Sequence, residues 1–245
     1  MKKLLLIGCL ILITACQSAD STPVPESTPT TAALHTPAPA TSTPAIPTPT
    51  DIPPPTPIPR YFTDDFTSLS SYWEFFQTGG TFTPSAVFEN ERLRVDIPSA
   101  DTWWMGIHNA HTYADVSIRA KVSAGPSGAV GLVCRYSEAF GWYEFNVASD
   151  GTYNVLYGKW LAPEVAQYIP LVTGGSNRLS TGGLDYELGL SCQDNFLNIY
   201  ANDALIRRVE VTNFGLVEGH IGVTAASFRE VTMTAVFDWV QVEEE

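Results

Sequence analysis

Two stretches of the chain alternate between apolar and polar residues, and this pattern limits the fold more than any other feature of the sequence. In ADVSIRAKV (residues 114–122) every second residue from Val116 onward is apolar, and LDYELGLSC (residues 184–192) alternates in the same way from Leu184. Successive side chains of a β-strand point to opposite faces, so each stretch is predicted to be a strand with one buried and one solvated face.

Similar short segments, rich in Val, Ile, Tyr, Phe and Trp and separated by turn residues, continue to the end of the chain. Hairpin turns are predicted at Ser149-Asp150-Gly151 and at Asn202-Asp203. No stretch sustains a helical period. The prediction is therefore an all-β fold, a two-sheet antiparallel β-sandwich or jelly roll.

Composition changes abruptly before this β-rich part. Residues 17–60 hold thirteen of the eighteen prolines and no aromatic residue, so they cannot form a core. Repeated Thr-Pro units favour an extended chain that rises ~3.1 Å per residue, which allows a reach on the order of 100 Å. We predict a disordered Thr/Pro-rich linker over residues 17–60 and one folded domain over residues 61–245.

The first sixteen residues, MKKLLLIGCLILITAC, are typical of a secretory signal. Their apolar run from Leu4 to Ile13 is shorter than the ~20 residues that span a bilayer as a helix. The ending Ile13-Thr14-Ala15-Cys16 resembles the lipobox of bacterial lipoproteins, and this resemblance implies that Cys16 is lipidated. The expected location is a membrane surface outside the cytoplasm, at the cell surface or in the periplasm. The alternative is a chance cysteine that ends an ordinary signal.

Charge and cysteine content narrow the partners of the domain. Residues 61–245 carry ten Lys and Arg against twenty-three Asp and Glu, which argues against nucleic acid and leaves neutral or cationic ligands. The two cysteines of the domain, Cys134 and Cys192, are predicted to form a disulfide, since the protein is exported. Two buried free thiols are the alternative.

The domain opens with FTDDFTSLSSYW and closes with AVFDWVQVEEE, and both ends resemble those of the concanavalin A-like lectin/glucanase superfamily, particularly its glycoside hydrolase family 16 members. Between them, GLVCRYSEAFGWYEFNVASDGTY and LGLSCQDNFLNIYANDALI look like LamG-like, non-catalytic jelly-roll modules related to the 3-keto-disaccharide hydrolase domain. The resemblance spans nearly all of residues 61–245 and implies a jelly roll.

The resemblance also implies where catalytic groups would lie. Family 16 enzymes carry two glutamates flanking an aspartate on one strand, in a Glu-x-Asp-x-(x)-Glu spacing that this chain lacks. Glu144 stands alone in its segment, and Asp185 and Glu187 share a strand face without a third carboxylate. We therefore expect a non-catalytic module, with an atypical hydrolase built on Glu144, Asp185 or Glu187 as the alternative.

A structural calcium ion is a further expectation from the resemblance. In that superfamily an acidic group near the first strand and an aspartate of the last strand share a cation. The matching residues here are Asp64 or Asp65 and Asp238, all with hard oxygen ligands. Turn capping or pairing with arginine is the alternative role for these aspartates.

The segment CRYSEAFGWYEFNV (residues 134–147) supplies the candidate ligand site. Alternation sends Tyr143 and Phe145 to the core, and a hairpin through residues 137–141 places Cys134 opposite Phe145 and Arg135 opposite Glu144. The other face then presents an aromatic ring beside polar groups, as a sugar platform does. The predicted ligand-binding residues are Arg135, Trp142, Glu144, Asn146, Tyr157 and Trp160. An ordinary sheet face is the alternative, and a bulge at Asp150-Gly151 would turn Tyr157 to the other side.

Two shorter motifs receive a structural interpretation. Trp103 and Trp104 are neighbours, so one is expected in the core and the other at a rim. His108 and His111 stand three residues apart, a spacing that would suit a metal site on a helix but that places them on opposite faces of a strand, and they are interpreted as loop histidines.

The leading functional hypothesis is a surface-tethered, non-catalytic carbohydrate-binding or adhesive module. Its expected partners are a polysaccharide or oligosaccharide of the cell wall or environment, and the membrane through the lipid anchor. A structural or protein-interaction module that binds no sugar is the remaining alternative.

Overall fold

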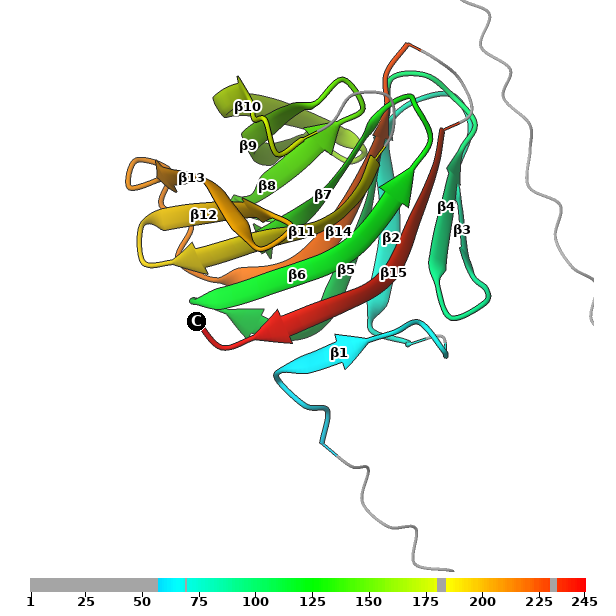
Figure 1. Cartoon of the computed structure of the whole chain (residues 1–245). Coiled ribbons are helices and arrows are strands. Elements are labelled where there is room, and N and C mark those ends of the chain that lie inside the picture. The colour runs from blue at the N-terminus through cyan, green and yellow to red at the C-terminus, as the bar shows by residue number, and fades with distance from the viewer. Residues whose placement is uncertain (1–56, 69, 180–183, 230–232) are drawn as a thin grey trace, which may run out of the picture. The chain divides into compact units, whose positions relative to one another are not determined.

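The computed structural model describes residues 57–68, 70–179, 184–229 and 233–245, which form two antiparallel sheets packed face to face (Figure 1). The lipidation site predicted at Cys16 and most of the predicted linker lie outside the described residues. No helix in the described ranges has the length and apolar character needed to cross a membrane.

One sheet has eight strands. Its order is β13 (Ala204–Glu210), β12 (Phe196–Ala201), β11 (Leu184–Gln193), β6 (Val116–Ala124), β15 (Met233–Glu243), β4 (Leu93–Ile97) and β3 (Ser85–Phe88), with β1 (Phe62–Asp64) also pairing with β15. The long strands β6 and β15 lie side by side although more than a hundred residues separate them in the sequence (Figure 1).

The other sheet has seven strands. Its order is β10 (Val165–Gly175), β9 (Thr152–Ala162), β8 (Gly141–Ala148), β7 (Ala129–Ser137), β14 (Gly219–Ser227), β5 (Thr102–Tyr113) and β2 (Trp73–Gly79). Chain segments cross repeatedly between the two sheets, which is typical of a jelly roll. The predicted all-β sandwich is confirmed.

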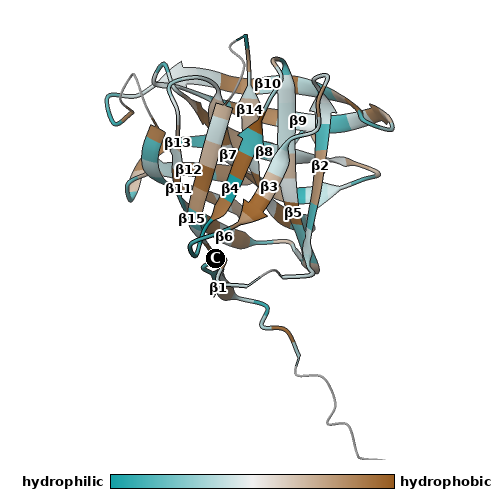
Figure 2. Cartoon of the chain, turned by 90° about the vertical axis from the view of Figure 1, so that its right-hand side faces the viewer, coloured by the Kyte–Doolittle hydropathy of each residue, from teal (hydrophilic) through white to brown (hydrophobic). Residues whose placement is uncertain are grey.

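The alternating stretches form the strands β6 and β11, which are neighbours in the eight-stranded sheet. Their apolar residues are buried between the sheets, as the alternation predicts. These residues are Val116, Ile118, Ala120, Val122, Leu184, Tyr186, Leu188, Leu190 and Cys192. Figure 2 shows the same alternation along β4, where apolar and polar residues take turns. Burial of one face per sheet supplies the main driving force for the fold.

Both predicted hairpin turns are confirmed. Asn202 and Asp203 join β12 to β13 with φ angles of 47° and 62°, the left-handed conformation that a two-residue turn requires. Residues 149–151 join β8 to β9, and Gly151 has a φ angle of 82°.

Candidate functional site

The seven-stranded sheet carries a second apolar cluster on its outer face, the face turned away from the sandwich core. We call it the second core. It consists of buried Met105, Ile107, Val133, Tyr136 and Trp142, with half-buried Phe76, Trp160, Ala166 and Tyr168 packed against them.

The second core is enclosed because the sheet curls over its own outer face. β10 and β2 are the two edges of this sheet, yet the Tyr168 hydroxyl of β10 lies 3.0 Å from Thr78 Oγ1 of β2. The Tyr168 ring also stacks on Trp103 of β5, with 4.9 Å between ring centroids. This face of the sandwich is therefore a packed interior rather than an open platform.

Trp142 lies at the centre of the second core and is fully buried. Its indole ring packs against Tyr136, Trp160 and Tyr168 at centroid distances of 5.7, 5.4 and 5.8 Å. Gly158 leaves the room for that ring, since a Cβ atom there would lie 2.2 Å from it. The prediction that Trp142 forms an exposed sugar platform is wrong, because the curl of the sheet covers the ring.

Glu144 is a carboxyl group enclosed in the same interior. Its Oε1 accepts hydrogen bonds from Trp103 Nε1 at 3.0 Å, from Asn146 Nδ2 at 2.9 Å and from Thr224 Oγ1 at 3.2 Å. Its Oε2 is buried and makes no hydrogen bond of regular geometry. Burial raises the pKa of Glu144, the hydrogen bonds, that of Asn146 foremost, offset part of this rise, and the Trp142 side chain also acts to lower the pKa of this carboxyl. The neutral acid is therefore favoured, and the predicted solvent-facing position of Glu144 and of buried Asn146 is wrong.

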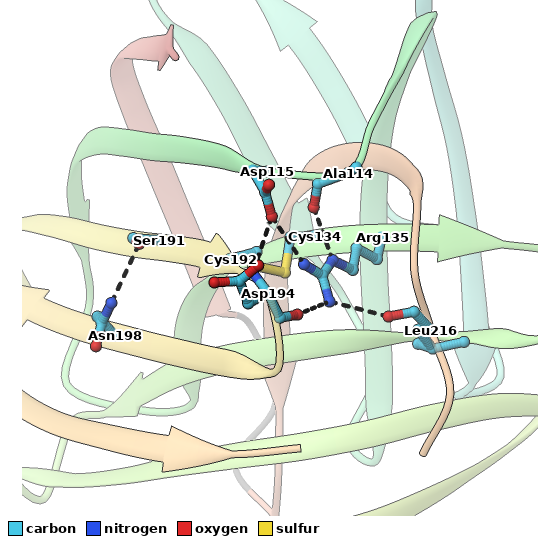
Figure 3. Close-up of polar contacts among 9 residues, drawn as sticks. All are labelled: Ala114, Asp115, Cys134, Arg135, Ser191, Cys192, Asp194, Asn198 and Leu216. Atoms are coloured by element: carbon cyan, nitrogen blue, oxygen red, sulfur yellow. Dashed lines mark hydrogen bonds and ion pairs between the residues drawn. A yellow bond between two sulfur atoms is a disulfide. The ribbon is translucent and has the colours of Figure 1, made fainter. Parts of the chain in front are cut away.

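The predicted disulfide is present, and the predicted strand register is shifted. Cys134 and Cys192 are bonded across 58 residues of sequence, a loop whose closure stabilises the fold by about 4 kcal/mol in a chain-entropy estimate (Figure 3). Cys134 pairs with Tyr143 and not with Phe145. The shift is two residues, so Cys134 stays on the predicted core side.

Arg135 is an inserted residue of β7, and this insertion changes its role. Its φ angle is 52°, and the pairing of β7 with β8 is irregular directly after Cys134. The buried guanidinium donates hydrogen bonds to the backbone carbonyls of Ala114, Asp194 and Leu216 at 2.8 to 2.9 Å (Figure 3). The predicted contact of Arg135 with Glu144 is wrong, and Arg135 fastens three loops instead.

Tyr157 and Trp160 complete the predicted ligand set, and β9 sends them to opposite faces. Tyr157 pairs with Tyr143 and packs on the sandwich core, and its hydroxyl donates to the Phe140 carbonyl at 2.7 Å. Its predicted place beside Trp142 is wrong. Trp160 is half-buried on the outer face, where its Nε1 donates to the Tyr136 hydroxyl at 3.2 Å.

Beside the second core, the surface is hollowed into what we call the acidic groove. It consists of two adjoining hollows of about 580 and 560 Å³ that share Glu74, Tyr136 and Glu138 as lining residues. The smaller hollow is also lined by Phe76 and Trp160. Of the six predicted ligand residues, Trp160 is the one that lines this groove.

The acidic groove combines aromatic rings with carboxylates and exposed apolar side chains. Its carboxylates come from Glu74, Glu138, Glu164 and Glu218. Phe140, Leu161 and Val217 line it with 71%, 61% and 72% of their surface exposed. Apolar rings and nearby hydrogen-bond acceptors form the kind of surface that takes a sugar ring.

Tyr136 lies where the two hollows meet. Burial raises the pKa of its phenol, the Trp160 hydrogen bond lowers it, and the carboxylates of Glu138 and Glu74 raise it further. Tyr136 is therefore a neutral hydroxyl at physiological pH, close to two carboxylates of the groove.

Asp185 and Glu187 lie far from this groove, on the outer face of the eight-stranded sheet. They form ion pairs with Lys121 and Arg119 of the neighbouring strand β6. Both carboxylates therefore already have a basic partner on the neighbouring strand.

The aspartates predicted to bind calcium are occupied by protein groups. Asp64 accepts hydrogen bonds from the Phe66 amide at 2.9 Å and from Trp73 Nε1 at 2.7 Å, and Asp238 pairs with Arg92 at 3.0 Å. Asp65 caps the following turn through the Thr67 amide at 3.2 Å. Within the described ranges no three His, Cys, Asp or Glu side chains gather into a metal site. This donor set does not fit calcium, since an arginine already neutralises Asp238.

The tryptophan pair behaves as predicted, and the histidines do not. Trp104 is buried in the sandwich core and Trp103 is half-buried on the outer face. His108 and His111 lie within β5 and not in a loop. His108 is buried against the rings of Phe62 and Trp73, and burial lowers its pKa to about 4.

Sequence reasoning missed the residues that give the groove its shape. Tyr168 closes the second core from the edge strand β10, and no local pattern predicts that this edge reaches β2. Glu138 and Phe140 were open to detection, because a carboxylate and a large aromatic residue stand at the tip of the predicted hairpin over residues 137–141.

No family model matches the sequence, and no curated protein does either. Among solved structures, the chain is similar to a protein of unknown function with a galectin-like fold from Bacillus subtilis, at 13% identity and a TM-score of 0.56, covering 75% of this chain and 94% of that one. It is also similar to a glycoside hydrolase family 16 endo-glucanase from Bacteroides ovatus, at 8% identity and a TM-score of 0.52, covering 74% and 99%. These likenesses show a shared jelly-roll fold.

Proposed function

We propose that this chain is a non-catalytic carbohydrate-binding or adhesive module and that its sugar site is the acidic groove. The observation that carries the proposal is the meeting of Phe76, Tyr136 and Trp160 with the carboxylates of Glu74 and Glu138 in one surface hollow. Aromatic rings take the C–H face of a pyranose, and carboxylates accept hydrogen bonds from its hydroxyls.

Two further observations argue against hydrolysis at the carboxylates for which the sequence offers it as the alternative, Glu144, Asp185 and Glu187. Glu144 is shielded from solvent, and three hydrogen bonds to Oε1 hold its side chain in place. Asp185 and Glu187 are paired with cations. Glycoside hydrolysis needs two carboxyl groups that flank an accessible bond.

The proposal is tested by a glycan array followed by calorimetry on the glycans that bind. Trp160→Ala removes the half-buried ring and is expected to weaken binding by about 2 kcal/mol, or roughly thirtyfold. Because this change also removes a contact with Trp142, thermal unfolding of the variant is measured in parallel.

A matched pair of leucines separates binding from folding. Leu161 lines the groove with 61% of its surface exposed, and Leu205 lies on β13, outside the groove, with 55% exposed. Leu161→Ala is expected to weaken glycan binding by about 1 kcal/mol, whereas Leu205→Ala leaves it unchanged. Equal behaviour of the two variants, or a silent array, contradicts the proposal.

We further propose that the module is held at a membrane surface through lipid on Cys16. The lipobox-like Ile13-Thr14-Ala15-Cys16 and the proline-rich residues that follow support this location. Cys16→Ser is expected to move the protein from the membrane fraction to the soluble fraction of cells that export it. Unchanged membrane association of that variant would rule out the lipid anchor.

A further inference from the structure

The carboxylates of the acidic groove lack cationic partners. Glu138, Glu164 and Glu218 form no ion pair with any residue that the structure describes, and Glu74 accepts a 2.6 Å hydrogen bond from the neutral amide of Asn109. No lysine or arginine is among the described residues that line the two hollows. The groove therefore holds four negative charges without compensation.

Some carboxylates outside the groove, by contrast, have a basic partner. Ion pairs join Arg92 to Asp238, Arg94 to Glu89 and Asp96, Arg119 to Glu187 and Asp203, Lys121 to Asp185, and Arg135 to Asp115. Basic side chains thus pair with part of the acidic surface outside the groove, whereas none of these ion pairs involves the four glutamates of the groove. A concave surface lined by one sign of charge concentrates the electric field and attracts ligands of the opposite sign.

An unpaired acceptor lies beside these charges. The side-chain oxygen of Gln77, which lines the smaller hollow, is buried without a hydrogen-bond donor, while its Nε2 donates to the Gly79 carbonyl at 3.2 Å. A buried acceptor without a partner is costly unless a ligand or water supplies the donor. This oxygen is closed to solvent, so the acceptors that the groove offers a ligand are the exposed carboxylates of Glu74, Glu138, Glu164 and Glu218, and these favour a positively charged ligand that is rich in donors.

We propose that the acidic groove selects oligosaccharides that carry free amino groups, such as polymers of glucosamine, over their N-acetylated and acidic counterparts. This inference rests on the proposed function and names the glycan class. An ammonium group offers three donors and a positive charge to the carboxylates, and the sugar ring packs on Trp160 and Phe76. Several carboxylates spread along adjoining hollows match a ligand with one amine on every residue.

The test is calorimetric titration of the full chain with four probes: a glucosamine hexamer, an N-acetylglucosamine hexamer, a galacturonic acid hexamer and a lysine hexapeptide. At an ionic strength of ~0.05 M the glucosamine hexamer is expected to bind at least about tenfold more tightly than the N-acetylated one. Raising the salt concentration to ~0.5 M should reduce this preference to less than about threefold.

Two charge-matched variants locate the effect. Changing Glu74, Glu138, Glu164 and Glu218 to glutamine is expected to abolish the preference for the glucosamine hexamer. Changing four exposed glutamates outside the groove, Glu91, Glu243, Glu244 and Glu245, to glutamine alters the net charge equally and should preserve the preference.

The outcomes separate this inference from the proposed function. Equal, Trp160-dependent binding of the two glucosamine-type hexamers overturns the amine selectivity and leaves a carbohydrate-binding module. Binding of the lysine hexapeptide as tight as that of the glucosamine hexamer also overturns it, because the groove would then be a general cation surface. If no glycan binds, both proposals fail.

Discussion

The two outer faces of this sandwich handle polar groups in opposite ways. On the eight-stranded sheet, half-buried Arg119 and Lys121 form ion pairs with the carboxylates of Glu187 and Asp185. On the seven-stranded sheet, Glu144 is enclosed among aromatic rings and its raised pKa favours the neutral acid. The difference follows from curvature, because a sheet that curls until its edges touch excludes the water that would otherwise solvate charge.

This contrast also locates the ligand surface. The hollow on the face of paired charges measures about 240 Å³ and is lined by groups that already pair with each other, Arg119, Glu187 and Asp203, while the second core is closed to solvent. The acidic groove lies beside the interior, where half-buried Trp160 and Phe76 remain accessible and the carboxylates are unpaired. Binding chemistry is therefore expected at this border and not at the centre of either sheet.

The largest change in the free energy of unfolding is expected from a substitution that tests whether the second core stabilises the fold. Trp142→Ala should lower the free energy of unfolding by about 3 to 5 kcal/mol, because it leaves a cavity among Tyr136, Trp160 and Tyr168. Tyr200→Ala, on the half-buried outer face of β12, should cost about 1 kcal/mol or less. Urea unfolding measures both, and similar losses would remove the distinction between the faces.

A second prediction concerns His108, a titrating side chain buried in the core between the two sheets. The pKa of His108 is lowered to about 4, mainly by burial, against an ordinary value of 6.5, while Asp64 opposes the shift and His111 and His220 add to it. Between pH 6.5 and pH 4 the unfolded chain therefore binds a proton at His108 that the folded protein does not bind. The stability that this neutral histidine allows is complete above pH 6.5. It should fall by about 3 kcal/mol at most as the pH drops to 4.

Urea unfolding at a series of pH values from 7 to 4 measures this loss. His108→Phe keeps an aromatic ring among Phe62, Tyr72 and Trp73 and removes the titrating group. That variant should lose stability less steeply over the same range. An unchanged slope would show that other groups cause the acid sensitivity.

The sequence predicts which side of a regular strand is buried, and it fails where a bulge or a contact between distant strands determines the position of a side chain. Alternation placed the apolar sides of β6 and β11 correctly, and the turns and the disulfide were also predicted. Alternation failed at Arg135, because one inserted residue with a φ angle of 52° turns the side chain away from the register that alternation assumes. At Trp142 alternation gave the correct outer face, but the predicted exposure was wrong, since nothing local shows that the edge strands β2 and β10 will meet and cover this ring.

A third prediction concerns the buried acid. Because burial raises the pKa of Glu144, the unfolded chain loses this proton around the ordinary pKa of 4.5, while the folded protein holds it to a higher pH. The stability contributed by this group is complete below pH 4.5 and decreases as the pH rises through the folded pKa. Glu144→Gln mimics the neutral acid and keeps an oxygen for Trp103, Asn146 and Thr224.

The Glu144→Gln variant is therefore expected to be more stable than the wild type by on the order of 1 to 2 kcal/mol at pH 8, with little difference at pH 4. Chemical unfolding at the two pH values gives both numbers. A variant that is less stable than the wild type at pH 8 would show that the folded protein holds Glu144 as a carboxylate.

The smallest change in the free energy of unfolding is expected from a substitution on the outer face of the eight-stranded sheet. Asp185 is 75% exposed and Lys121 is 34% exposed, so solvent screens their ion pair strongly. Asp185→Asn should therefore lower the free energy of unfolding by less than about 1 kcal/mol at low salt and by less still at ~1 M salt, as urea unfolding in the two buffers would measure. A loss above about 2 kcal/mol that persists at high salt would mean that the polar groups of this face stabilise the fold as strongly as those of the curled face. In that case exclusion of water could not be the reason why the two faces treat carboxylates differently.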